Sequence, residues 1–321
     1  MPASPSIKLG VLPWPQYTDW PSLRDVGALV DRLGFDSLWT WDHLDPIVGS
    51  PDGPIFEGWL TLAGWVPVTE RVTLGLMVGA NTFRNPALVA KMATTLDHQS
   101  GGRAVLGLGA AWFEPEHTAY GLDFGRSVGE RLDWLDEAVE LIHGMVRGEQ
   151  PSARGPHYRA KRVRNEPPPI QQRLPILIGG AGERKTLRTV ARFADAWNVG
   201  GDVDYVRHKD EVLRRWCDEF GRDESEIERT LNIGTVVIRD TPAEANRVLE
   251  VMHRHHAGWE NEPELAGTPD RIAETLVPYV ELGFRHVYFD LPAPFDEETL
   301  ERLVGEVKPR LADAVPAGAG R

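Results

Sequence analysis

The chain has 321 residues, a formal net charge of −13 at pH 7 and a single cysteine, Cys217. One cysteine excludes an intrachain disulfide and a cysteine-rich metal site, and the acidic balance disfavours nucleic acid and anionic membranes as partners. No run of 18 apolar residues and no basic, apolar leader are found, so we expect a cytoplasmic protein without a membrane-spanning segment.

Short apolar runs alternate with longer helical patterns along almost the whole chain. Periodicity predicts eight strands, at Ile7–Leu12, Ser37–Trp41, Val72–Val78, Ala104–Gly109, Ile176–Gly179, Ala196–Val199, Leu231–Val237 and His286–Phe289. It predicts helices between or after them, at Leu23–Leu33, Trp59–Val66, Ala87–Leu96, Arg131–Met145, Arg184–Phe193, Val203–Phe220, Ala243–His256 and Arg271–Leu282. This order favours a closed (β/α)₈ TIM barrel over an open doubly wound sheet. We therefore expect one α/β domain over residues 1–321, with its core at about residues 7–308.

Three connections exceed ordinary loop length. Ala110–Phe124 follows the fourth predicted strand, so we expect it at the carboxyl face of the barrel, closing over a ligand. Gly148–Leu174 follows a helix and belongs to the opposite face, and Gly258–Pro269 separates two helices.

The first candidate motif is Thr40–Leu44, immediately after the second strand. Asp42 and His43 lie there at the carboxyl face, where a neutral imidazole can give or take a proton. The alternative is a helix-capping Asp and a half-buried structural His.

Two further motifs place small residues at strand ends. In Gly75–Pro86, Gly79 and Ala80 allow a flat ring to approach the backbone, although an ordinary strand–turn–helix would look the same. In Leu106–Trp112, Gly107 and Gly109 leave room beside the barrel axis or merely relieve crowding.

The fourth motif, Ile178–Leu187, is a strand that enters a glycine-rich turn and then a helix. The turn, made by Gly180, Ala181, Gly182 and Glu183, predicts a phosphate site because backbone N–H groups at a helix start bind anions. Arg184 and Lys185 would add positive charge, which Glu183 would oppose if it pointed inward.

Other residues carry weaker signals. Trp41 and Trp112 belong to a group of tryptophans near the active-face ends, where they could stack on a ring system or form plain core. His253–His256 suggests a metal cluster at first sight, but its position late in a helix suits cationic side chains, and we expect no metal site.

Taken in order, these pieces resemble the bacterial luciferase-like family of flavin enzymes, and most closely its branch dependent on the deazaflavin coenzyme F420. The resemblance covers roughly Ile7 to Lys308. Its carriers are LGFDSLWTWDHL (Leu33–Leu44), GLMVGANTFRNPALVAKMATTLDHQSGGR (Gly75–Arg103), LGLGAAWFEPEHTAYG (Leu106–Gly121), GERLDWLDEAVELI (Gly129–Ile142), ILIGGAGERKTLRTVARFADAWN (Ile178–Asn198) and GTPDRIAETL (Gly267–Leu276).

The resemblance implies an oxidoreductase with roles for particular residues. Asp42 and His43 would lie near the ring and the reacting centre, and the Met77–Val78 peptide would be a non-prolyl cis bond beneath the ring. Ala181 and Gly182, with the following amides, would take the cofactor phosphate, and Asn198 would lie near the ring. The resemblance also implies a homodimer and a small-molecule substrate.

The chain departs from the family's sugar-phosphate dehydrogenases at one position. Where they carry an acidic glutamate after the fourth strand, this chain has Trp112, which can stack on a substrate but cannot donate a proton. We therefore expect a substrate other than a phosphosugar. The alternatives are an FMN-dependent monooxygenase supplied by a partner flavin reductase, a non-catalytic flavin-binding protein, and, more remotely, a metal-dependent barrel hydrolase.

Overall fold

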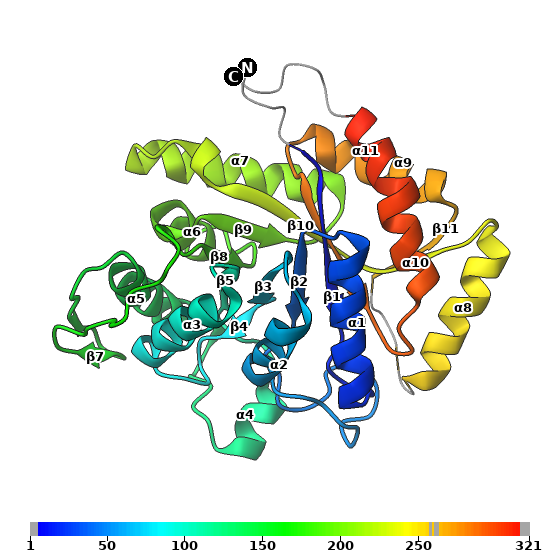
Figure 1. Ribbon diagram of the computed structural model, residues 1–321. Coiled ribbons are helices and arrows are strands. Elements are labelled where there is room, and N and C mark those ends of the chain that lie inside the picture. Colours follow the sequence, from blue (N-terminus) through cyan, green and yellow to red (C-terminus); the bar gives the residue numbers. More distant parts are fainter. Residues whose placement is uncertain (1–5, 257–258, 260–262, 315–321) are drawn as a thin grey trace.

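The computed structural model describes residues 6–256, 259 and 263–314. Within these residues a closed barrel of eight parallel strands forms the centre, because β10 pairs with both β9 and β12 (Figure 1). The barrel strands are β1 (Lys8–Pro13), β2 (Ser37–Thr40), β3 (Thr73–Leu76), β5 (Ala104–Gly109), β8 (Ile176–Gly179), β9 (Ala196–Val199), β10 (Glu228–Ile238) and β12 (His286–Leu291). The (β/α)₈ barrel predicted from the sequence is confirmed.

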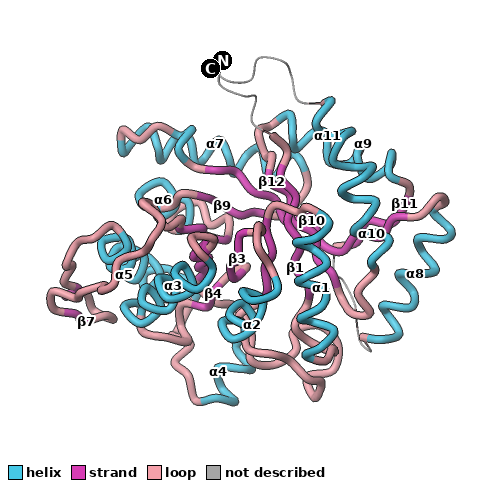
Figure 2. The backbone as a smooth tube through the Cα atoms, viewed as in Figure 1, coloured by secondary structure: helices cyan, strands magenta, loops and turns pink. Residues whose placement is uncertain are grey.

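Helices surround the strands on the outside (Figure 2). The larger ones are α1 (Trp20–Leu33), α2 (Gly58–Trp65), α3 (Pro86–Ser100), α5 (Val128–Val146), α6 (Thr186–Phe193), α7 (Val203–Phe220), α8 (Pro242–His255) and α9 (Pro269–Glu281). Their ends follow local chemistry: the Asn85 side chain accepts from the Ala87 N–H ahead of Pro86, and Gly34 ends α1 with φ of 89°. None of the helices in the described part of the chain is long and apolar enough to cross a membrane.

Several short elements were not predicted, because two to seven residues carry too little periodicity. Segment Ala110–Phe124 contains a helix, and Gly148–Leu174 contains a hairpin. Segment Gly258–Pro269 contains a strand, although residues 258 and 260–262 lie outside the described residues. The additional elements are β4 (Gly79–Ala80), α4 (Glu114–Tyr120), β6 (Ala153–Arg154), β7 (Arg159–Ala160), β11 (Glu264–Gly267), α10 (Glu297–Arg302), α11 (Lys308–Asp313), the 3₁₀ turns η1 (Val66–Val68) and η2 (Glu224–Glu226), and a π-helical turn η3 (Leu303–Val307).

Two strands differ from the prediction in ways that shape the carboxyl face. The strand expected at Val72–Val78 ends at Leu76, and a cis peptide bond between Met77 and Val78 separates it from β4. Strand β10 begins at Glu228 and is bulged, since its register against β12 shifts between Asn232 and Thr235.

A charged group joins three strands at the opposite, amino end of the barrel. The Glu228 carboxylate accepts from Lys8 Nζ at 2.8 Å and lies 3.3 Å from His286 Nδ1. Burial raises the pKa of Glu228, but His286 and Lys8 outweigh burial and lower it to about 2. Since β1, β10 and β12 meet there, this group stabilises the closure of the barrel.

We predict that Glu228→Gln weakens the protein near neutral pH but not in acid. The pKa of folded Glu228 lies below its ordinary value of 4.5, so the stabilisation is present above that pH and is lost as the pH falls toward 2. Thermal unfolding followed by circular dichroism should give a midpoint lower by roughly 1–2 °C at pH 7, and no difference near pH 2. The exposed Glu219→Gln is the matched control; an equal loss at both pH values would contradict the assignment.

Candidate active site

A cavity of about 390 Å³ lies at the carboxyl ends of the barrel strands. It brings together most of the site residues expected from the sequence: Trp41, Asp42, His43, Met77, Val78, Gly79, Ala80, Gly109, Trp112, Gly180 and Asn198. Ala110, Ala111 and Glu116 of the long fourth connection also line it, so this segment borders the cavity as expected. Its helix α4 lies at the lower edge of Figure 1.

His43 is held by a buried carboxylate. Its Nδ1 lies 2.9 Å from Glu116 Oε1, while Glu116 Oε2 accepts the Leu44 N–H at 2.8 Å. The Glu116 side chain is only 1% exposed, and a carboxylate can only accept, so Nδ1 carries the hydrogen. This tautomer leaves Nε2 of the imidazole to act on a ligand.

The neighbouring Asp42 binds a guanidinium group and a backbone amide instead of an imidazole. Its Oδ2 accepts from the Ala80 N–H at 2.9 Å and from Arg84 Nη1 at 2.7 Å, and Arg84 Nη2 binds Glu57 Oε1 at 2.6 Å. Burial raises the pKa of Asp42, and the Arg84 guanidinium opposes that shift. Burial by itself would lower the pKa of Arg84, but Asp42 and Glu57 raise it. We infer that Asp42 anchors β4 and the start of α3 rather than reacting.

Three glycines of the cavity wall lie where a side chain would collide with a neighbouring residue. An added Cβ at Gly109 would lie 2.6 Å from Val78 Cγ2, and one at Gly179 would lie 3.0 Å from Val78 Cγ1. At Gly79 it would lie 2.9 Å from the Gly107 carbonyl oxygen. The absence of side chains at Gly109 and Gly179 therefore makes room for the Val78 side chain, and the absence of one at Gly79 allows close approach to β5.

The glycine-rich turn lies at the edge of the cavity. Gly179, Gly180 and Thr186 line the cavity, whereas Gly182 and Glu183 are exposed to solvent. The Glu183 side chain turns outward to His208 Nε2 at 2.9 Å and Lys209 Nζ at 2.6 Å on α7. The Glu183 carboxylate binds side chains of α7 and does not point into the cavity. Of the Glu183 groups expected at the cofactor site, only the backbone amide remains for that role.

Aromatic side chains surround the imidazole. The ring centroid of Trp112 lies 5.6 Å from that of His43, and that of Trp41 lies 6.4 Å away, both at steep angles. Trp112 is 63% exposed, which is unusual for so large an apolar side chain. Its position beside His43 suits a side chain that packs on a bound molecule.

Some lining residues were not identified from the sequence. Glu116 lies within the segment Leu106–Gly121, and no local pattern marks it; only its contact with His43, 73 positions away, reveals it. Asn232 fell within a predicted strand, and Thr186 within a predicted helix. Ile47 and Leu132 complete the apolar lining, and nothing in the sequence distinguishes them from core residues.

The histidine-rich segment has separate partners. His253 contacts Glu264, His255 contacts the Tyr17 carbonyl and His256 contacts the Ala293 carbonyl. Burial lowers the pKa of His256 to about 4. Among residues 6–256, 259 and 263–314, no three His, Cys, Asp or Glu side chains are grouped so that they could hold a metal ion.

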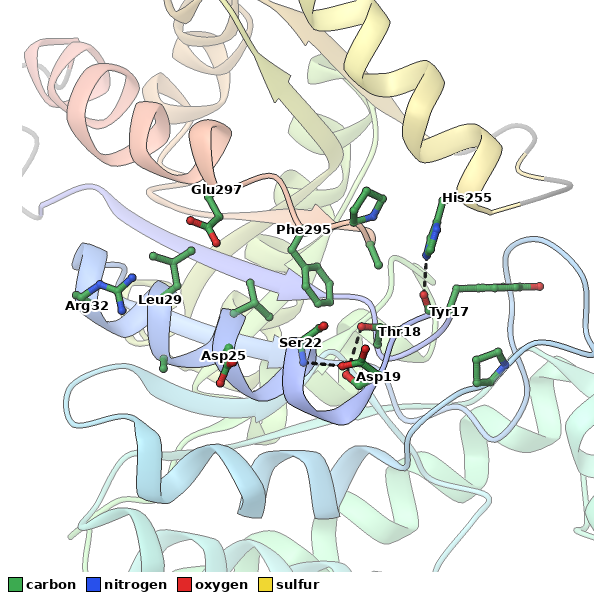
Figure 3. Close-up of a pocket in the computed structure, with 15 residues that line it drawn as sticks. Tyr17, Thr18, Asp19, Ser22, Asp25, Leu29, Arg32, His255, Phe295 and Glu297 are labelled. Atoms are coloured by element: carbon green, nitrogen blue, oxygen red, sulfur yellow. Dashed lines mark hydrogen bonds between the residues drawn. The ribbon is translucent and has the colours of Figure 1, made fainter.

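A larger groove, of about 800 Å³, lies along the outside of α1 (Figure 3). Its polar groups are involved in local structure: Asp19 accepts the Ser22 N–H at 2.8 Å, and His255 contacts Tyr17. It shares no lining residue with the cavity that holds His43. The cavity at the barrel mouth is therefore the candidate active site, because (β/α)₈ enzymes carry theirs at this face.

Comparison with known proteins shows the family of the chain. The luciferase-like monooxygenase family matches residues 7–265. The F420-dependent glucose-6-phosphate dehydrogenase of Microbacterium testaceum (strain StLB037) is 29% identical over 317 residues, covering 90% of this chain and 93% of that protein.

Solved structures share the barrel at lower identity. An F420-dependent secondary alcohol dehydrogenase in complex with an F420-acetone adduct has a TM-score of 0.81 at 17% identity, covering 96% of this chain and 99% of that one. The oxygenating constituent of 3,6-diketocamphane monooxygenase from Pseudomonas putida, in complex with FMN, has a TM-score of 0.72 at 17% identity, covering 95% and 99%. At these identities the likeness establishes the fold alone.

The buried ion pair at the cavity gives a stability prediction. Arg84→Met leaves the Asp42 carboxylate, 1% exposed, without its counter-charge, and should lower the free energy of unfolding by about 3 kcal/mol. Urea unfolding measures this loss, and Arg24→Met, which removes a surface pair with Asp25, should change little. The double variant Asp42→Asn/Arg84→Met should recover part of the lost free energy of unfolding, because the buried negative charge is removed as well. An unchanged urea midpoint for Arg84→Met would show that Arg84 does not stabilise the buried Asp42 carboxylate.

Proposed function

Because this chain belongs to the luciferase-like monooxygenase family, we propose that it is a deazaflavin-dependent oxidoreductase. It transfers hydride between coenzyme F420 and a small organic substrate. The observation that carries the proposal is the carboxyl-face cavity, in which the His43–Glu116 pair faces the wall formed by residues 77–80. The name of the Microbacterium testaceum relative supports F420 in particular.

The residues present fit a flat ring with a phosphate. The apolar wall of Met77, Val78 and Ala80 offers a flat surface, and the Asn198 carboxamide borders the same space. The phosphate would lie at Ala181 and Gly182, whose turn precedes α6, close in sequence to Arg184 and Lys185. Gly180, with φ of 119°, gives this turn a conformation that other residues rarely adopt.

When bound, a deazaflavin would supply or accept a hydride, and the residues of this chain would position it and handle the proton. His43 Nε2 gives or takes the proton that accompanies the hydride at the substrate oxygen, depending on the direction of the reaction. Glu116 holds the imidazole in one tautomer and stabilises the imidazolium that forms when Nε2 accepts a proton. Asp42 and Arg84 keep the wall in place, and Trp112 limits access of water to His43.

We propose a substrate other than a phosphosugar, although the Microbacterium testaceum relative is named for one. The described residues that line the cavity include no Lys or Arg, the side chains that form the strongest charge-assisted hydrogen bonds to a phosphate ester. The exposed face of Trp112 favours an apolar or aromatic surface on the substrate.

An FMN-dependent monooxygenase is the second candidate, since a neighbour of similar fold was solved with FMN. It would require reduced flavin from a partner reductase. Both cofactors combine a tricyclic ring with a phosphate, so the cavity geometry suits either.

Absorbance and fluorescence titration of the purified protein distinguishes the cofactors. We expect tight binding of F420 and weaker binding of FMN by at least about tenfold. Preferential binding of FMN, with oxygen consumed on reduction, would favour the monooxygenase. Binding of F420 without substrate-dependent change in its absorbance across a panel of alcohols and aldehydes would favour a non-catalytic binding protein.

Substitutions of the imidazole pair test the mechanism. With the best substrate of that panel, His43→Ala should lower kcat by about 10²–10⁴-fold. Glu116→Gln should lower kcat by at least about tenfold with a smaller change in KM, because Nδ1 loses its carboxylate partner. Imidazole ¹⁵N chemical shifts should show one tautomer for His43 in the wild type and a mixture in Glu116→Gln. Unchanged turnover in His43→Ala would remove it from the mechanism.

A further inference from the structure

Helix α4, in the long connection after β5, is held over the barrel mainly by polar side chains. Of its seven residues only Glu116 and His117 are buried, and the other five are exposed. A helix this short is marginal by itself, and most helices are stabilised by an apolar face that packs on the core. The exposed Tyr120 adds a longer contact, of 3.4 Å, to the Leu44 carbonyl. The position of α4 therefore depends chiefly on the hydrogen bonds of Glu116 and His117.

His117 uses both of its ring nitrogens. Nδ1 lies 2.8 Å from the Phe113 carbonyl oxygen, which can only accept, so Nδ1 carries the hydrogen. Nε2 is then an acceptor, and the Thr82 hydroxyl donates to it at 2.6 Å. Thr82 lies in the turn between β4 and α3, just after the wall formed by residues 77–80. The first bond fixes the start of α4, and the second joins the helix to the wall.

Glu116 joins the same helix to a different strand end. Its carboxylate binds His43 Nδ1 at 2.9 Å and the Leu44 N–H at 2.8 Å, both after β2. Because Glu116 and His117 are consecutive in one turn of helix, the position of one side chain determines that of the other. A displacement of α4 by about 1 Å away from β2 would take Glu116 out of hydrogen-bond range of the imidazole.

The ends of the connection are held separately from its middle. Arg131 of α5 donates to the Ala111 carbonyl at 3.3 Å and to the Phe124 carbonyl at 3.2 Å, and its guanidinium lies 3.7 Å from the centre of the Phe124 ring. The Phe124 ring in turn packs on His117, with 4.6 Å between the ring centroids. Loss of the bond between Thr82 and His117 would therefore release α4 while both ends of the connection stay on α5.

We propose that His117 is a positioning residue for the imidazole of His43. Bound to the Thr82 hydroxyl, it fixes α4 so that the Glu116 carboxylate stays on Nδ1 of His43. The cavity wall and the proton-handling imidazole are thereby held in register through one short helix. The consequence for proton transfer rests on the proposed function, in which His43 Nε2 reacts with the substrate. The control of Glu116 by His117 stands independently of it.

Amide hydrogen exchange in the cofactor-free protein tests the positioning directly. The Leu44 amide reports on Glu116, which accepts its hydrogen, and the Ala80 amide, held by Asp42, reports on the wall. Thr82→Val replaces the hydroxyl by a methyl group, whereas Thr82→Ser keeps the hydroxyl. We expect Thr82→Val to speed exchange at Leu44 by about fivefold, the factor that corresponds to one net hydrogen bond. Thr82→Ser should leave that rate near the wild-type value, and Ala80 should keep its rate in both variants.

Imidazole ¹⁵N chemical shifts of His43 give a second measurement on the same samples. Thr82→Val should show a mixture of tautomers, and Thr82→Ser the single tautomer of the wild type. Thr95→Val, the same substitution on the exposed side of α3, is the matched control. Unchanged exchange at Leu44 in Thr82→Val would overturn the proposal. Equal acceleration at Leu44 and Ala80 would also overturn it, because the whole rim would then have loosened.

His117→Phe is the second variant, for use if Thr82→Val folds poorly. It keeps an aromatic ring beside Phe83 and Phe124 but can make neither hydrogen bond of the imidazole. We expect the same acceleration at Leu44 and the same mixture of His43 tautomers. A lowered midpoint of thermal unfolding with both of these readouts unchanged would show that His117 is structural only.

A double-mutant cycle on the cofactor-loaded protein tests whether Thr82 acts through Glu116. Thr82→Val alone should lower kcat by about fivefold with little change in KM. In the Glu116→Gln background it should have little further effect, because the ion pair with His43 that it disturbs is already lost. An undiminished fivefold effect in that background would overturn the proposal. Failure of F420 to bind would instead contradict the proposed function and leave the exchange and ¹⁵N results intact, so the two failures are distinguishable.

Discussion

Closure of the parallel barrel is the constraint on which the remaining structure depends. Strand β10 pairs with β9 on one side and β12 on the other, so no barrel strand lacks a neighbour. All carboxyl ends then meet at one rim, and side chains far apart in the sequence become neighbours. The parallel pairing of β2, β3 and β5 brings His43 and Glu116 together, and the pairing of β9 with β10 places Asn198 and Asn232 along one cavity. At the amino end, the same closure brings Lys8, Glu228 and His286 together.

The rim also has to accommodate buried charge. A carboxylate removed from water needs donors or a counter-charge, and Asp42 and Glu116 satisfy this need in different ways. Asp42 takes Arg84 and the Ala80 amide, which fixes the cavity wall. Glu116 takes His43 and the Leu44 amide, which fixes an imidazole. Two adjacent residues in the sequence, Asp42 and His43, thus serve different purposes because their side chains meet different partners.

A shared scaffold hosts many activities, and the site decides among them. In the active-site cavity the described lining has no Lys or Arg, and its one buried carboxylate pair, Asp42 and Glu116, is bound by Arg84 and His43. The side chains at the strand ends, rather than the barrel itself, therefore set the chemistry of this space.

The sequence by itself determined the strand–helix order, because periods of 2 and 3.6 residues are local properties, and it located Asp42, His43 and the Met77–Val78 wall at strand ends. It also specified caps such as Asn85–Pro86, which depend on adjacent residues. Only the tertiary structure decided the partners: Glu116 for His43, Arg84 for Asp42, and α7 for Glu183. The bulge at Asn232–Thr235 was equally beyond sequence reasoning. These features arise from contacts between segments that only the folded barrel brings together, and no local pattern encodes which side chains will meet.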